Sequence, residues 1–180
     1  MKALPFTKYS IKGNPVACPI CGSSDSTTIS KFDRRFKILP HCKCNECALV
    51  RHKFMLSDDQ LADYYSNSYR KDYQRVNFGP TLKHVSKRAH EARSRLAKLE
   101  AYSIKNAKVL DFGCGSGEFV ELMQTEGAIS RGFEPGSLYA SYAKEQKGLN
   151  VENCGWENYD CNEKMDLITS FHVFEHLTNP

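Results

Sequence analysis

Two pairs of cysteines, each with two residues between its members, are the first candidates for chemistry in this sequence. Cys18 and Cys21 form one C-x2-C pair, Cys44 and Cys47 form the other, and 22 residues separate the pairs. Zinc takes four tetrahedral ligands and accepts thiolate readily, and each such turn aims two sulfurs at one point. The spacing therefore predicts a four-cysteine zinc site. Four thiolates leave no open coordination position, so the metal would hold structure and take no part in catalysis.

The competing interpretation is that these cysteines are unpaired and pack as small apolar side chains. It does not account for two pairs with equal spacing. His41 and Cys42 lie beside the second pair, and we expect both to be bystanders. Between the pairs, residues 27–31 and 36–39 favour the two strands of a hairpin.

A glycine-rich stretch supplies the second candidate site. Asp111 lies at the end of a short apolar run, and Gly113, Gly115 and Gly117 follow at alternate positions. Glycines at a strand-to-helix turn let a ligand approach the backbone closely. The pattern differs from the G-x-G-x-x-G dinucleotide fingerprint and lacks the Lys-Ser/Thr ending of a P-loop. Glu134 comes 21 residues after Gly113, where a carboxylate can accept hydrogen bonds from the ribose hydroxyls of a nucleoside.

The elements around this stretch alternate between strand and helix. Apolar runs predict strands at about 109–112, 129–134, 149–153 and 165–171, with helices at 119–125 and 138–146 between them. This alternation predicts an α/β fold with a doubly wound, Rossmann-like parallel sheet. His172, Glu175 and His176 follow the last strand, at the carboxyl edge where such sheets bind ligands.

Two helices are expected before the sheet. Ser57 and Gln60 form a capping box that predicts the start of a short helix. Apolar residues recurring at steps of three and four predict a second helix over residues 81–102, and they are Leu82, Val85, Ala89, Ala92, Leu96 and Leu99.

These elements divide the chain into four parts. We expect a loosely ordered tail at 1–15, a zinc-ribbon module at 16–56, a helical linker and lid at 57–105, and an incomplete sheet domain at 106–180.

The composition is that of a globular protein, with 180 residues of which 41% are hydrophobic and 26% charged. No apolar run approaches the roughly 20 residues that cross a bilayer, and the first residues lack the apolar core of a secretory signal. We therefore expect a cytoplasmic protein whose eight cysteines are thiols or metal ligands.

Residues 1–105 carry 20 Lys and Arg against 9 Asp and Glu, whereas residues 106–180 carry 5 against 12. The basic half indicates either an anionic partner or a solvated helix face.

Three motifs resemble those of the class I S-adenosylmethionine (SAM)-dependent methyltransferases. They are the glycine stretch, the acidic end of the next strand and the fourth-strand segment, carried by Asp111–Gly117, Glu134–Pro135 and Asp166–Pro180. The four-cysteine module is similar to that of sugar C-methyltransferases and related polysaccharide-cluster enzymes. The resemblance covers about residues 16–180 and implies SAM as the cofactor. The family's sheet has seven strands and this chain supplies about four, so we expect a C-terminally truncated enzyme.

Transferred position by position, the resemblance assigns residues to cofactor binding. Asp111 and the glycine loop would hold the amino acid end of SAM, and Glu134 would bind the ribose hydroxyls. Trp156 would either stack on the adenine or be a partly buried aromatic. The full set is Asp111, Gly113, Cys114, Gly115, Gly117, Glu134, Pro135, Trp156 and Phe171.

The segment after the fourth strand carries the predicted catalytic residues. Methylation of a hydroxyl or an enolisable carbon needs a base, and histidine is suited to this near neutral pH. His176 is the predicted base, Glu175 would orient it or the substrate, and His172 would line the site. The alternative is that Glu175 and His176 cap a helix or brace the loop. The tyrosines between positions 64 and 73 would close over the site or pack the domain junction.

The predicted function is methyl transfer from SAM to a small-molecule acceptor, with a nucleotide-linked sugar as the acceptor that the resemblance favours. A membrane partner is not expected. Two alternatives stay open: an RNA methyltransferase that uses the ribbon and the basic helix, and a non-catalytic fragment that binds SAM and zinc. Nucleic acid is the less favoured partner, because the ribbon shows no conspicuous aromatic platform and its basic residues are scattered.

Overall fold

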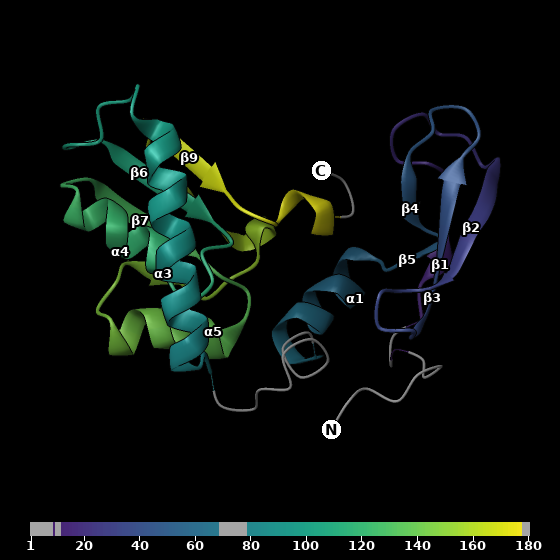
Figure 1. The fold of residues 1–180 in the computed structure, drawn as a ribbon, viewed down its shortest axis with the longest axis horizontal. Coiled ribbons are helices and arrows are strands. Elements are labelled where there is room, and N and C mark those ends of the chain that lie inside the picture. The colour runs from purple at the N-terminus through teal and green to yellow at the C-terminus, as the bar shows by residue number, and fades with distance from the viewer. Residues whose placement is uncertain (1–8, 10–11, 69–78, 178–180) are drawn as a thin grey trace. The chain divides into compact units, whose positions relative to one another are not determined.

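The computed structural model describes Tyr9, residues 12–68 and residues 79–177. The chain divides into two compact units, one of residues 1–64 and 177–180 and the other of residues 65–176, both drawn in Figure 1. Among the described residues, no helix has the length and apolar character that spanning a bilayer requires. Tyr69 and Tyr73, which were expected to close over the site or pack the junction, lie outside the described residues.

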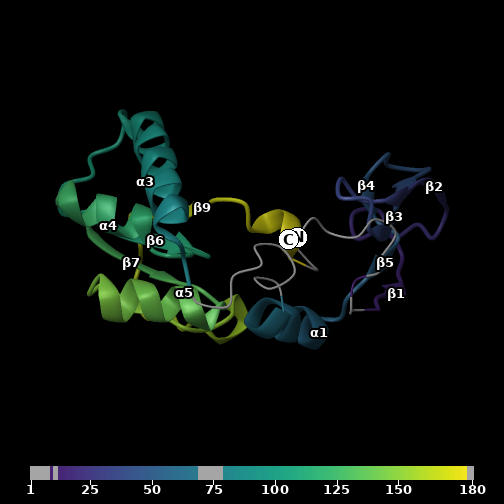
Figure 2. The same ribbon diagram turned by 60° about the horizontal axis from the view of Figure 1, so that its bottom comes forward.

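The first unit is built on a three-stranded antiparallel sheet in the order β2-β3-β4 (Figure 2). β2 (Ser26–Phe32) and β3 (Ile38–Cys44) form the expected hairpin, and β4 (Val50–His52) pairs with the other edge of β3. β1 (Asn14–Pro15) pairs with β5 (Phe54–Met55) in a separate two-stranded sheet. The tail was expected to be loose up to residue 15, and this is wrong for the two residues of β1, because backbone pairing fixes them.

The capping box is confirmed at the start of α1 (Asp58–Asp63). The Ser57 hydroxyl accepts from the Gln60 backbone N–H at 3.4 Å, and the Gln60 side chain accepts from the Ser57 N–H at 3.1 Å. A π-helical turn, η1 (Tyr64–Ser68), follows α1.

The second unit contains a four-stranded parallel sheet, which confirms the predicted fold class. Its order is β8-β7-β6-β9, and every neighbouring pair is parallel. The strands are β6 (Lys108–Phe112), β7 (Ile129–Phe133), β8 (Val151–Glu152) and β9 (Leu167–Ser170). Strands β8 and β9 are shorter than the apolar runs in the sequence predicted, because only part of each run pairs with a neighbouring strand.

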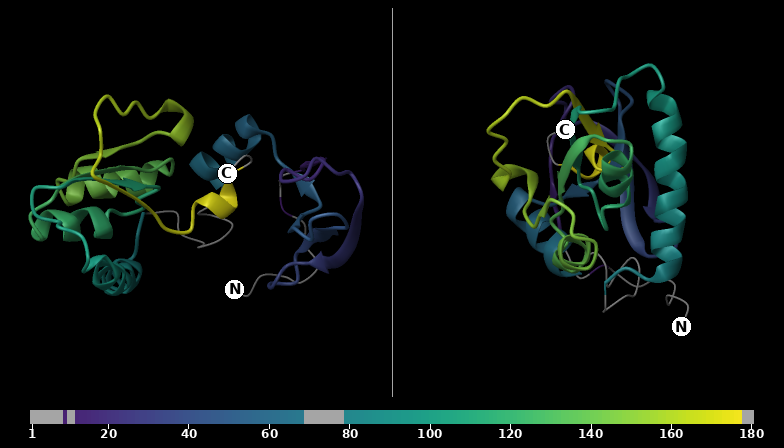
Figure 3. Two further views of the ribbon diagram at one scale, coloured as in Figure 1. Left: turned by 90° about the horizontal axis from the view of Figure 1, so that it is seen from above. Right: turned by 90° about the vertical axis from the view of Figure 1, so that its left-hand side faces the viewer.

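Three helical segments cover one face of this sheet. They are α3 (Leu82–Leu96) with η2 (Ala97–Leu99), α4 (Glu118–Thr125), and α5 (Ser137–Ser141) with η3 (Tyr142–Gln146). Val109 packs with α3 and α4, and Val151 packs with α5 and η3. Their register partners in β7, Ser130 and Gly132, are two residues apart, so both valines point to the same side. In both views of Figure 3, α3 lies to one side of the strands.

Helix α3 begins as predicted, after its N-cap Thr81, but it ends earlier than predicted and its first apolar residue is exposed. It gives way to a 3-10 turn after Leu96, whereas the apolar pattern indicated a helix to residue 102. Leu82 is 86% exposed, so the first member of the apolar stripe is outside the core. Ala92, Leu96 and Leu99 do pack against Val109 and the residues of α4. The stripe is therefore buried only where the sheet lies beneath it.

Candidate functional site

The glycine loop joins β6 to α4 at the carboxyl edge of the sheet. Gly113, Gly115 and Gly117 have φ angles of 70°, 60° and 80°, in the left-handed region that side chains rarely adopt. A Cβ on Gly113 would lie 2.6 Å from the Cγ2 of Val173, so protein packing excludes a side chain there. A Cβ on Gly115 would meet nothing within 4 Å. The loop is therefore open at Gly115, where a ligand can approach the backbone.

Glu134, directly after β7, is the acidic partner of this loop. Its side chain is buried, and Oε2 accepts from the Gly115 N–H at 3.0 Å while Oε1 accepts from the Gly136 N–H at 2.9 Å. One carboxylate thus ties the end of β7 to the open part of the glycine loop. Each carboxylate oxygen keeps acceptor capacity beyond one hydrogen bond, so it can also accept from a ligand hydroxyl.

Asp111 lies beneath the loop, 4% exposed, and accepts from the Thr169 hydroxyl at 2.7 Å. Burial raises the pKa of Asp111 to about 7, against the hydrogen bond from Thr169 and the positive charge of Arg95, which lower it. The charges of Glu134 and Glu118 raise this pKa further. Asp111 therefore changes its protonation state near neutral pH.

The structure places Phe171 in the apolar cluster under α3. Its ring meets Phe119 edge-on, with centroids 5.0 Å apart, and the Arg95 guanidinium lies 4.0 Å from its centroid. Arg95 thus contacts the ring just after β9 and also acts on the charge of Asp111. The role of Phe171 in lining a cofactor stays a prediction.

A buried ion pair beside the loop was missed from the sequence. Lys147 Nζ lies 3.5 Å from Glu118 Oε1 and 2.7 Å from Glu121 Oε2. The other oxygen of Glu118 accepts from the buried Ser116 hydroxyl at 2.8 Å. Lys147 therefore joins the end of η3 to the first turn of α4 and, through Glu118, to the glycine loop. A lysine and a glutamate 29 residues apart give no sequence signal.

The other predicted cofactor residues surround the ends of β7 and β8. Cys114 is buried, and burial raises the pKa of its thiol. The backbone oxygen of Pro135 accepts from the Asn153 side-chain amide at 3.2 Å, a contact that sequence reasoning also missed. Trp156 lies in the 3-10 turn η4 (Trp156–Asn158) and is 47% exposed. Its ring is thus accessible to a ligand.

The segment after β9 brings the predicted catalytic residues together in the turn that leads into η5 (Phe174–His176). His172 has a φ of 60°, and its Nδ1 lies 3.3 Å from Glu175 Oε1. The imidazole of His176 meets the ring of Tyr65 edge-on, with centroids 5.8 Å apart. Desolvation lowers the pKa of His176, and the Glu175 charge opposes this effect. Neutral His176 can accept a proton near neutral pH, whereas the Glu175 carboxylate contacts His172.

The four paired cysteines of the first unit form one group. Their sulfur atoms all lie within 4.8 Å of one another, and the Cys18–Cys47 and Cys21–Cys44 sulfur pairs are each 3.5 Å apart. Tetrahedral Zn–S bonds of about 2.3 Å require sulfurs roughly 3.8 Å apart, so the donor set fits zinc. In each pair the backbone of the second cysteine hydrogen-bonds to the first sulfur, which lowers the pKa of Cys18 to about 6 and also lowers that of Cys44.

His41 and Cys42, which neighbour this group in the sequence, do not belong to it. Cys42 is buried in β3 and is not a member of the group, and the His41 ring instead meets His52 edge-on, with centroids 5.0 Å apart.

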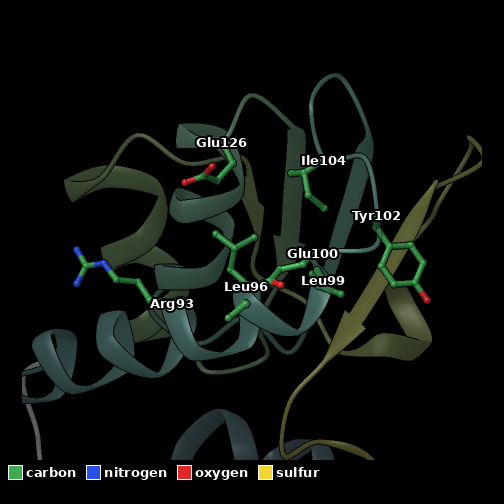
Figure 4. A pocket seen from close by; sticks show the side chains of 8 residues that line it. Arg93, Leu96, Leu99, Glu100, Tyr102, Ile104 and Glu126 are labelled. Carbon is green, nitrogen blue, oxygen red and sulfur yellow. The ribbon is translucent and has the colours of Figure 1, made fainter.

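A surface hollow of about 330 Å³ lies elsewhere in the second unit (Figure 4). It is lined by Arg93, Leu96, Ala97, Leu99, Glu100, Tyr102, Ile104 and Glu126. These residues come from the last turn of α3, from η2, from the segment before β6 and from the end of α4. The hollow is therefore at the amino edge of the sheet, away from the glycine loop.

Comparisons with known proteins bear on this site. A family model described as a methyltransferase domain matches residues 84–180. The ubiquinone biosynthesis O-methyltransferase of Coxiella burnetii is 31% identical over 90 residues, an alignment that covers 43% of this chain and 36% of the relative. The chain thus spans about a third of the length of this curated relative.

A solved structure shares the fold. The magnesium protoporphyrin IX methyltransferase of Synechocystis PCC 6803, crystallised with bound SAM, superposes with a TM-score of 0.52 at 18% identity, covering 68% of this chain and 65% of that one. Its Rossmann-like core corresponds to the parallel sheet described above. Since the family model matches more than half of the residues, and the fold agrees with it, this chain belongs to the methyltransferase-domain family.

Proposed function

We propose that the chain is a class I SAM-dependent methyltransferase that acts on a small-molecule acceptor. The observation that carries this proposal is the link between Glu134 and Gly115, which places a buried carboxylate beside the open part of the glycine loop. The residues present fit SAM, because a ligand with ribose hydroxyls needs such an acceptor and close backbone approach needs such a loop.

Each part of the cofactor has a candidate partner. Glu134 would accept hydrogen bonds from the ribose hydroxyls, and the backbone of residues 113–115 would hold the amino acid end. Pro135 and Trp156 would lie against the adenine. SAM, when bound, supplies a methyl group on a positively charged sulfonium. Methyl transfer then depends chiefly on holding the acceptor in line with that group.

Removal of the acceptor's proton is assigned to His176. Desolvation keeps its imidazole neutral near pH 7, which is the form that accepts a proton. Glu175, through its contact with His172 Nδ1, would fix the turn that carries His176. A substitution of His176 by Gln should lower kcat without weakening SAM binding, whereas a bracing role would lower stability and leave kcat per folded molecule unchanged.

The class of acceptor rests on similarity. The curated relative is named as an O-methyltransferase, which favours a hydroxyl acceptor. The similarity of the four-cysteine module to that of sugar C-methyltransferases favours a nucleotide-linked sugar. Either acceptor would be a small molecule, and methylation of either would require a base to remove a proton.

The four-cysteine group is proposed to hold a structural zinc ion. The support is the donor set itself, four sulfurs within 4.8 Å of one another on two C-x2-C turns. With four thiolates bound, the ion would stabilise the first unit and offer no position to substrate.

The proposal is tested by calorimetric titration of the zinc-loaded chain with SAM. We expect Glu134→Gln to weaken binding by tenfold or more, because it removes a buried charged acceptor. Glu145→Ala is the matched control, since Glu145 is an exposed acid of η3 and should leave binding unchanged.

Three outcomes are distinguishable. Binding that depends on Glu134, followed by methyl transfer to an acceptor in a small-molecule screen, supports the whole proposal. Binding that depends on Glu134 without transfer to any acceptor would support the cofactor site and refute the catalytic role of this chain. Absence of SAM binding by folded protein would refute the proposal.

A further inference from the structure

The turn between β2 and β3 concentrates positive charge around an exposed aromatic ring. Lys31, Arg34, Arg35 and Lys37 fall within seven residues of chain, and Lys31 and Arg34 are exposed. Phe36 is 63% exposed. These basic residues are thus clustered both in the sequence and at one tip of the hairpin. We call residues 31–37 the basic tip.

The acid within the basic tip is used to build the turn. One carboxylate oxygen of Asp33 accepts from the backbone N–H groups of Arg35 at 2.8 Å and Lys37 at 2.9 Å. The other accepts from the Tyr9 hydroxyl at 2.6 Å. Burial acts to raise the pKa of Asp33, but these hydrogen bonds outweigh it and lower the pKa. Asp33 therefore stays ionised and holds the shape of the tip, in which four basic residues accompany this one acid.

The β2–β3 turn accounts for the backbone conformation of Phe36. Its φ is 58°, a left-handed conformation that costs a bulky residue about 1 kcal/mol or more. Its N–H donates to the Asp33 carbonyl at 3.0 Å and the Asp33 N–H donates to the Lys37 carbonyl at 3.0 Å, the pattern of a hairpin turn that ends in a left-handed residue. Glycine would adopt this conformation without the cost, whereas the ring that stands there is exposed and adds nothing to the core. The ring is therefore accessible to a ligand.

A ring flanked by cations matches a ligand that combines flat bases with phosphates. Unstacked bases of single strands stack on aromatic side chains, and Lys and Arg pair with the phosphates. A duplex hides its bases within its own stack and offers only phosphates to such a convex tip. A lipid surface would meet only two exposed rings in the basic tip, Phe36 and the less exposed Phe32, which gives little apolar burial.

We propose that the basic tip is a docking surface for single-stranded nucleic acid, with Phe36 stacking on a base and Lys31 and Arg34 contacting phosphates. This goes beyond methyl transfer and does not depend on it. It departs from the expectation that the ribbon has no conspicuous aromatic platform, because Phe36 is exposed among the basic residues.

The test is fluorescence anisotropy of the zinc-loaded, full-length chain with a labelled 12-nucleotide oligouridylate, and with a 12-base-pair RNA duplex for comparison. Phe36→Gly removes the ring and suits the positive φ, so it should fold at least as well as the native chain. We expect it to weaken oligouridylate binding about tenfold, whereas Phe36→Tyr should stay within about twofold. Arg34→Ala should lower the slope of log affinity against log salt by about 0.7, and Lys43→Ala, an exposed cation of β3, should change it less.

The outcomes separate cleanly. Oligouridylate binding that falls with Phe36→Gly while thermal unfolding is unchanged supports the proposal. Equal affinity for the duplex, or equal affinity of the Phe36→Gly chain, would overturn it, because phosphates alone would then account for binding. Absence of oligouridylate binding with retention on vesicles of phosphatidylcholine and phosphatidylserine would overturn it in favour of a lipid surface.

Discussion

Lys147 offers the sharpest test of how the glycine loop is held in place. Its side chain is 10% exposed and that of Glu118 is 5% exposed, and their charged atoms lie 3.5 Å apart. Glu118 in turn accepts from the Ser116 hydroxyl inside the loop. Lys147→Met removes the positive charge, keeps most of the aliphatic volume and leaves a buried carboxylate without its partner.

The expected cost follows from burial. Removing one partner of a buried ion pair costs about 3–5 kcal/mol, because the remaining charge is buried without compensation. The separation of 3.5 Å is at the long end for such a pair, so we expect about 3 kcal/mol. The second acid, Glu121, is 51% exposed, and exposed pairs contribute about 0–1 kcal/mol. Glu121→Gln is therefore the matched control.

The assay is denaturant unfolding followed by the fluorescence of Trp156, the single tryptophan, which lies in the second unit. In the double variant Glu118→Gln with Lys147→Met neither charge is left, so it should be more stable than Lys147→Met alone. A double-mutant cycle should give a coupling energy of at least about 1.5 kcal/mol. Additive effects, or a cost below about 1 kcal/mol for Lys147→Met, would refute this account of the loop.

Three further predictions concern the two candidate sites. Burial raises the pKa of Asp111 from 3.8 to about 7, so the folded state binds this proton more tightly than the unfolded state does. The free energy of unfolding should therefore fall as pH rises from about 4 to about 7. Asp111→Asn should remove this pH dependence when unfolding is measured across that range. Gly115→Ala should cost about 1 kcal/mol for its left-handed φ and weaken calorimetric SAM binding, whereas Gly113→Ala should cost more, because its Cβ would also lie 2.6 Å from a valine methyl. Chelation of zinc, or Cys44→Ser, should unfold the first unit, seen by circular dichroism, while the Trp156 signal of the second unit stays native.

The parts of the fold that sequence reasoning predicted well are those whose signal is local. The hairpin, the capping box and the alternation of β6, α4 and β7 each depend on residues close together in the chain. The glycine loop is of the same kind, because its turn conformation is set within five residues. The C-terminal end of helix α3 and the extent of its buried stripe were predicted less well. Periodicity marks an apolar stripe but does not say how far the sheet extends beneath it, and Leu82 is exposed for that reason.

The contacts that escaped prediction join residues far apart in sequence. Asn153 reaches the backbone beside Glu134, and Arg95 on α3 reaches Phe171 after β9. A lone Asn or Arg has no spacing pattern, so only the packing of β8 against β7, or of α3 over the sheet, brings it to its partner. The basic tip escaped for a related reason. Its charges are close together in the sequence, but the exposure of the Phe36 ring among them follows only from the turn that Asp33 fixes.

The glycine loop itself combines two kinds of constraint that look alike in the sequence. At Gly113 the neighbouring Val173 excludes a side chain, so the requirement for glycine comes from the protein's own packing. At Gly115 no protein atom lies where a side chain would project, and the N–H is held by Glu134. The φ of 60° favours glycine at this position, and the open space beside its N–H leaves room for a ligand to approach. The two substitutions should therefore separate, with Gly113→Ala acting mainly on stability and Gly115→Ala mainly on affinity for SAM.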